Sequence, residues 1–71
     1  MKTQQLCKDF LRMRKGTEVE AMQASQLMNQ HWGILVDWHE MSDALEYLVQ
    51  SWEARRTGTG PDGLTMYFIG G

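Results

Sequence analysis

The sequence predicts an α+β fold in which three helices precede a β-hairpin. Apolar side chains recur at spacings of three, four, three and four over residues 38–52, the period of an amphipathic helix: Trp38, Met41, Leu45, Leu48 and Trp52. A glycine-rich stretch with strong turn chemistry at Pro61-Asp62-Gly63 follows. The run Leu64–Ile69 is then rich in residues that favour strands. Two weaker helical patterns precede the first of these segments.

Length and composition indicate one domain over residues 1–71, with a folded core. The chain has 71 residues, a hydrophobic share of 42% and three tryptophans. Its one cysteine, Cys7, cannot form an intramolecular disulfide. There is no signal-peptide pattern and no apolar run long enough to span a bilayer, so we expect a cytoplasmic protein without membrane contacts.

The net charge of −2 conceals an uneven distribution along the chain. Residues 1–16 hold five Lys or Arg against one Asp. Residues 17–53 hold seven Asp or Glu and neither Lys nor Arg, and residues 54–71 hold two Arg and one Asp. A basic segment therefore precedes an acidic middle and a slightly basic end, a pattern that bears on partners more than on fold.

The first helix is expected over Thr3–Lys15, with Thr3 as its cap and Gly16 at its end. Its apolar face carries Leu6, Phe10 and Met13. Its last turn carries a basic cluster of Arg12, Arg14 and Lys15. Cations suit the end of a helix dipole, so this cluster is explained equally well by helix stability and by a binding role.

Residues 17–21 fit two different local structures, and a second predicted helix follows them. The alternation over Thr17–Ala21 matches a short strand, whereas Thr17-x-x-Glu20 matches a capping box, and both interpretations stay open. A helix is expected over residues 21–31, ended by Gly33, with one face made by Met22, Leu27 and Met28. The apolar turn at residues 31–36 is expected to tuck under the core.

The third helix begins after Asp37, which resembles an N-cap in a capping box with Glu40. Three tryptophans are expected chiefly in the core, although an exposed one could anchor a partner: Trp32, Trp38 and Trp52. Strands are expected over residues 53–57 and 64–69, joined by a flexible tip. In the last strand, Leu64, Met66 and Phe68 share one face, and Thr65, Tyr67 and Ile69 share the other.

Three phrases resemble the winged helix-turn-helix superfamily. "EVEAMQASQLMNQ" is similar to its second helix, "DWHEMSDALEYLVQSW" to its third helix, and "EARRTGTGPDGLTMYFI" to its wing. The resemblance implies a small regulator in a DNA-related setting, of a kind common in phages and bacteria. It also implies that the third helix enters the major groove and that the wing touches the backbone or the minor groove.

The charge of the third helix departs from that pattern, because DNA affinity rests largely on Lys and Arg that neutralise phosphates. We therefore expect a non-enzymatic protein that acts through contacts with a protein partner, or with a second copy as a homodimer. The partner-contact candidates are His39, Glu40, Asp43, Glu46, Tyr47 and Gln50. The alternative is a regulator of double-stranded DNA, whose contact candidates are Arg12, Arg14, Lys15, Arg55, Arg56, Thr57 and Thr59.

Catalytic and metal chemistry find little support in the sequence. Cys7 lies on a predicted amphipathic helix, with no general base placed near it by the sequence. His31 and His39 are separated by Gly33 and do not share one helix, so we expect no metal site and no cofactor. The glycines near the hairpin tip lack the Lys-Ser/Thr and the following helix of a phosphate loop.

Overall fold

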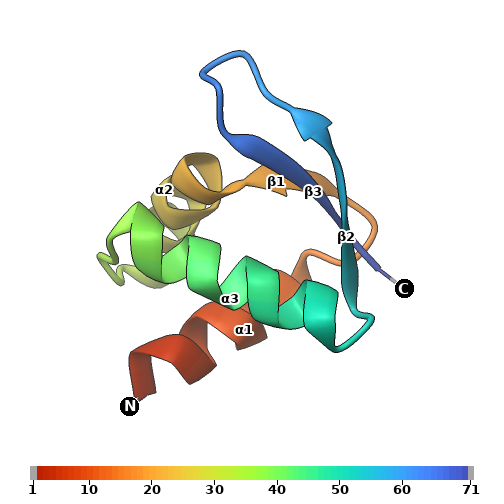
Figure 1. Cartoon of the computed structure of the whole chain (residues 1–71). Helices are drawn as coiled ribbons and strands as arrows, with labels where there is room; N and C mark the ends of the chain where they lie inside the picture. The colour runs from red at the N-terminus through yellow and green to blue at the C-terminus, as the bar shows by residue number, and fades with distance from the viewer. Residues whose placement is uncertain (1, 71) are drawn as a thin grey trace.

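The computed structural model describes residues 2–70, which form three helices and a three-stranded antiparallel sheet (Figure 1). In chain order the elements are α1 (Lys2–Met13), β1 (Glu18–Glu20), α2 (Ala21–Trp32), α3 (Trp38–Gln50), β2 (Ala54–Thr59) and β3 (Thr65–Ile69). Helix α3 lies between α1 on one side and the sheet on the other, and the β2–β3 tip projects away from the helices (Figure 1). Within this range no helix has the length and the apolar character to cross a membrane.

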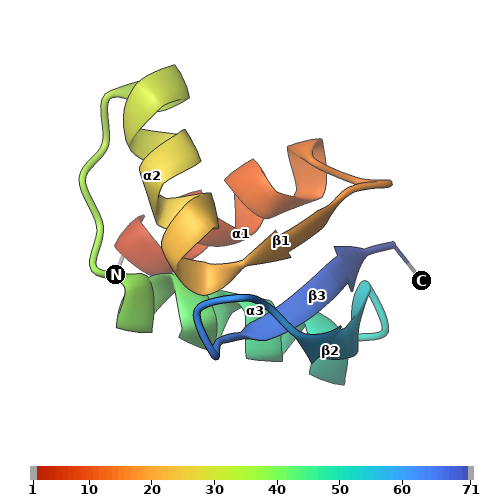
Figure 2. The same cartoon turned by 90° about the horizontal axis from the view of Figure 1, so that it is seen from above.

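The sheet places β3 between β1 and β2 (Figure 2). Tyr67 on β3 lies opposite Val19 on one side and Arg56 on the other. Of the two alternatives at residues 17–21, a short strand or a capping box, the structure shows the strand, which pairs with the hairpin. The register shifts between Arg56 and Gly58, so Thr57 forms a bulge in the edge strand β2.

The core is formed where the three helices meet one face of the sheet. Its largest fully buried side chains are Leu11, Met28, Met41, Leu45, Leu48 and Ile69. On β3 the buried side chains are Tyr67 and Ile69, whereas Met66 and Phe68 on the opposite face are half-buried. The strand thus buries the face that also carries Thr65, and not the face with the more uniformly apolar side chains.

The capping box expected at Asp37 is wrong, and the capping box that was one of two alternatives at Thr17 does not form. Glu20 itself caps α2, since its Oε1 accepts a hydrogen bond from the Gln23 amide at 2.7 Å. The Thr17 hydroxyl instead donates to the carbonyl oxygen of Arg14. Asp37 stands at the N-cap of α3 but makes no side-chain capping bond, and its backbone carbonyl alone accepts from the first turn.

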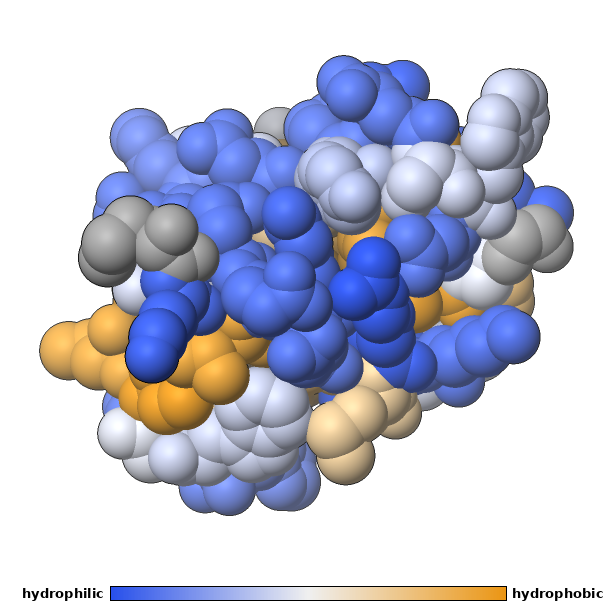
Figure 3. Space-filling view, turned by 90° about the horizontal axis from the view of Figure 1, so that it is seen from below, coloured by the Kyte–Doolittle hydropathy of each residue, from blue (hydrophilic) through white to orange (hydrophobic). Residues whose placement is uncertain are grey.

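Other local expectations are also corrected. Helix α1 begins at Lys2, so Thr3 lies inside it and does not cap it, and it ends at Met13 rather than at residue 15. Met22 is exposed on α2 although it was expected on the core face. In the turn before α3, Leu35 is 83% exposed while its neighbours pack against the core. Figure 3 shows hydrophobic surface at the left edge, where this turn lies in Figure 1.

Candidate functional site

The outer surface of α3 carries the residues predicted to contact a partner. His39, Asp43, Tyr47 and Gln50 are exposed at spacings of four, four and three, so they form one stripe along the helix. Glu40 and Glu46 flank this stripe and are half-buried. The structure therefore brings all six predicted residues to one helix but exposes only four of them.

The α1 side of this surface is occupied by contacts within the protein. The Gln4 side-chain amide donates to the Glu40 carbonyl oxygen at 2.9 Å and to its carboxylate at 2.5 Å. The Lys8 ammonium lies 3.7 Å from the centroid of the Tyr47 ring, within range of a cation–π interaction. Both contacts join α1 to α3, and the contact from Lys8 orients the Tyr47 ring at the surface.

The sheet side of α3 is held by Glu46. Its carboxylate accepts hydrogen bonds from the Arg56 guanidinium and from the Tyr67 hydroxyl. The hydrogen bond from Arg56 lowers the pKa of Glu46, with a smaller contribution from Tyr67. Burial and the neighbouring Glu46 raise the pKa of Tyr67 to about 12, so its hydroxyl keeps the proton that it donates. Arg56 thus pairs at the surface with a carboxylate of the same chain, and its side chain stays 55% exposed.

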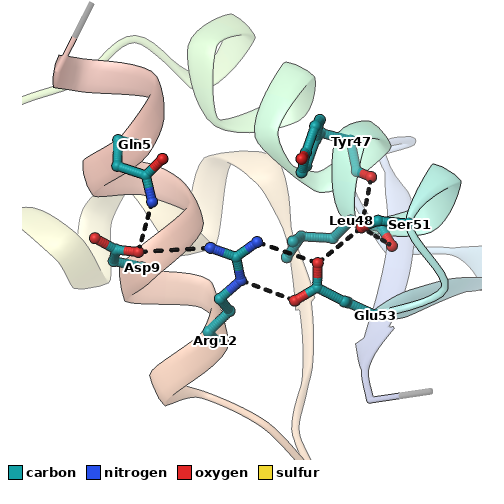
Figure 4. Close-up of polar contacts among 7 residues, drawn as sticks. All are labelled: Gln5, Asp9, Arg12, Tyr47, Leu48, Ser51 and Glu53. Atoms are coloured by element: carbon teal, nitrogen blue, oxygen red, sulfur yellow. Dashed lines mark hydrogen bonds and ion pairs between the residues drawn. The ribbon is translucent and has the colours of Figure 1, made fainter.

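A second arginine from the predicted DNA-contact set pairs with a carboxylate in the same way. Arg12 on α1 donates from Nε to Glu53 Oε1 at 2.8 Å and from Nη2 to Oε2 at 3.1 Å (Figure 4). Asp9 lies 3.6 Å from its other terminal nitrogen, and the Ser51 hydroxyl donates to Glu53 as well. The bonds from Arg12 and then Ser51 lower the pKa of Glu53 to about 2. This bidentate pair ties the end of α1 to the turn after α3.

The remaining predicted DNA-contact residues are exposed except for Arg14, which is half-buried. Lys15 and Arg55 are exposed, as are Thr57 and Thr59 on β2. The Arg55 guanidinium lies 4.9 Å from the Phe68 ring on the sheet face opposite the core, and the Arg14 guanidinium lies 6.0 Å from the Phe10 ring. Within residues 2–70 none of Arg14, Lys15 and Arg55 lies within 4.0 Å of a carboxylate. Of the predicted DNA-contact set, these three cations have no carboxylate partner among the described residues.

The sequence did not predict the surface cavity beside Trp52. A cavity of about 420 Å³ is lined by Arg12, Lys15, Trp52, Glu53, Ile69 and Gly70. Trp52 was expected chiefly in the core, but α3 ends at Gln50 and the tryptophan is 86% exposed. Its spacing of four from Leu48 continued the helical period, so no local signal in the sequence marked the earlier helix end.

Cys7 is buried on α1, and it faces the protein interior rather than solvent. Burial raises the pKa of its thiol to about 11, and the nearby Glu40 adds to this shift. A thiol in this setting stays protonated at neutral pH, which disfavours nucleophilic chemistry. Across the described residues no three His, Cys, Asp or Glu side chains gather in a way that could hold a metal ion.

The fold and surface define a small α+β domain whose helices cover one face of a three-stranded antiparallel sheet. No protein-family model matches the chain, and no curated protein or solved structure shows significant similarity to it.

Proposed function

We propose that this chain is a non-enzymatic winged-helix protein that acts in DNA-related regulation through protein contacts. The order helix, strand, helix, helix and hairpin supports the winged-helix assignment, as does the position of β1 beside β3. In this arrangement α3 is the helix that would face a DNA groove and the β2–β3 hairpin is the wing.

The observation that carries the proposal is the internal pairing of two arginines that a DNA-binding role would need. Arg12 pairs with Glu53 and Arg56 pairs with Glu46, so each of these exposed guanidinium groups has a carboxylate of the same chain beside it, which opposes the approach of a phosphate. The exposed stripe on α3 adds Asp43 and no Lys or Arg. Phosphate binding depends on released counterions and hence on accessible cations, which this helix does not provide.

The same stripe suits a protein partner with a basic surface. Asp43 supplies an exposed carboxylate, and Tyr47 supplies an aromatic side chain already oriented by Lys8. Tyrosines of this kind dominate binding energy at interfaces, because they bury a large area at a small cost in conformational entropy. His39 and Gln50 extend the stripe with hydrogen-bonding groups.

Fluorescence anisotropy with a labelled DNA duplex, recorded across a salt series, tests the proposal. The parent protein is expected to give no saturable binding even at low salt. The variant Asp43→Lys reverses one exposed charge on α3, and Glu18→Lys makes the same change on β1 as a matched control. If only Asp43→Lys binds the duplex, weakly and in a salt-sensitive way, the result supports the view that α3 is the helix that would face the DNA groove. It also supports the view that the negative charge of α3 prevents DNA binding by the parent protein.

Tight binding by the parent protein, with a steep loss of affinity as salt rises, would contradict the proposal and favour a DNA-binding regulator. Arg14, Lys15 and Arg55 are the observation on which that second candidate rests, since no described carboxylate pairs with them. In that case Lys15→Ala and Arg55→Ala should each weaken binding and reduce the salt slope by about 1. Unchanged affinity in both variants would exclude the role of these cations.

A further inference from the structure

We propose that the cavity beside Trp52 is a self-association site, in which Trp52 of each copy enters the cavity of a second copy of this chain. The inference goes beyond the proposed function, because it names a surface separate from the exposed stripe of α3 and a second copy of this chain as the partner. The surface consists of Trp52 with Arg12, Lys15, Glu53 and Ile69, and it lies between the end of α1, the turn after α3 and the end of β3.

The backbone at Trp52 is unfavourable for any side chain. Its φ of 64° lies in the left-handed region, and it is the one residue other than glycine with a positive φ in the described chain. The Trp52 amide donates to Val49 O at 3.1 Å and the Glu53 amide to Leu48 O at 2.8 Å, which is the Schellman arrangement. Glycine usually occupies this position, because a Cβ there meets the backbone.

The side chain at this strained position is also exposed. Trp52 is 86% exposed, so its indole contributes little to the core of the single chain. A large aromatic residue therefore stands where the backbone favours glycine and where packing within the chain gains little from it. Contact with another molecule accounts for both facts, since exposed tryptophans are the strongest anchors of protein interfaces.

The adjoining cavity can accommodate such an anchor. Its volume of about 420 Å³ falls within the range of well-formed binding pockets. Trp52 is itself the exposed apolar side chain of the lining, since Ile69 is only 2% exposed, while Lys15 and the Arg12 guanidinium add cations. An incoming indole would therefore meet the indole of the receiving copy and cations able to lie against its ring face.

Charge and symmetry favour a second copy as the occupant. Trp52 is followed directly by Glu53, so an entering tryptophan brings a carboxylate with it, and Lys15 is an exposed cation in the receiving cavity. A twofold dimer requires that anchor and receptor occupy the same patch, and here Trp52 lines the cavity itself. Figure 4 shows Glu53 and Arg12 facing each other across this junction.

Sedimentation equilibrium of the full chain tests the proposal, from ~10 µM to ~1 mM, because a small interface gives a weak dimer. The parent protein is expected to dimerise reversibly within this range. Trp52→Gly deletes the anchor and suits the local backbone, so it is expected to fold and to weaken dimerisation by ~100-fold or more. Lys15→Glu is expected to weaken it as well, by opposing Glu53 of the second copy. Leu35→Ala removes a similarly exposed apolar side chain from the turn before α3 and should leave dimerisation unchanged.

Circular dichroism will check that each variant is folded. Tryptophan emission gives an independent measure of dimerisation. Emission of the parent protein should shift to shorter wavelength as concentration rises, and that shift should be lost in Trp52→Gly. A parent protein that stays monomeric throughout would overturn the inference, as would a dimer equally affected by Leu35→Ala or unaffected by Trp52→Gly. The DNA titration decides the proposed function separately, since absence of a dimer leaves its outcome unaltered.

Discussion

Replacing Trp52 by glycine and by alanine gives a direct test of the conformation at the end of α3. Both variants delete the same exposed indole, so the small loss of packing cancels in the comparison. They differ in the cost of a Cβ at a φ of 64°, which is about 1 kcal/mol in favour of glycine. In a domain of this size that difference corresponds to about 4–8 °C in Tm.

The sign of this difference is the informative part. At an ordinary helical position alanine is the more stable residue by about 0.5–1 kcal/mol. The matched control is the pair Asp43→Gly and Asp43→Ala, at an exposed site inside α3, where alanine should be the more stable. Thermal unfolding followed by circular dichroism measures all four variants. If alanine proves at least as stable as glycine at position 52, the left-handed conformation and the reasoning built on it are refuted.

Three further predictions concern the core, the ion pair and the thiol. Leu45→Ala, which opens a fully buried site, should lower the free energy of unfolding by about 2–5 kcal/mol in urea titrations; a loss below ~1 kcal/mol would count against that burial. Because Arg12 holds the pKa of Glu53 at about 2, below its unfolded value, this pair should stabilise the fold above pH ~5 and lose that effect as pH falls towards 2. Acid unfolding of Glu53→Gln should therefore show a shallower decline, and an unaltered profile would speak against the pair. Cys7 should react with a thiol reagent only as urea unfolds the chain, because it is buried with a raised pKa; rapid modification of the folded protein would be the contrary result.

Helix α3 and the hairpin were predictable because their signals are local. The helical period of its buried residues Met41, Leu45 and Leu48 specifies one face of a helix whatever it packs against. The turn chemistry at Pro61-Asp62-Gly63 and the strand-forming residues that follow specify a hairpin in the same way. Each of these elements appears in the structure within a residue or two of its expected bounds.

The site was only partly predictable, because exposure depends on what neighbouring elements contribute. From the sequence, Glu46 was predicted to contact a protein partner and Arg56 was predicted to contact DNA. The fold instead brings them together across α3 and β2, ten residues apart in the chain. The pairing of Arg12 with Glu53 spans 41 residues and leaves no local signature.

The sequence by itself determined the three helical segments, the two strands of the hairpin, the uneven charge and the absence of Lys and Arg along residues 17–53. Only the tertiary structure decided which face of β3 is buried, whether β1 joins the sheet and where Trp52 points. The physical reason is that periodicity and turn chemistry act between neighbours in the chain. Burial and ion pairing depend on surfaces that meet only after the chain has folded.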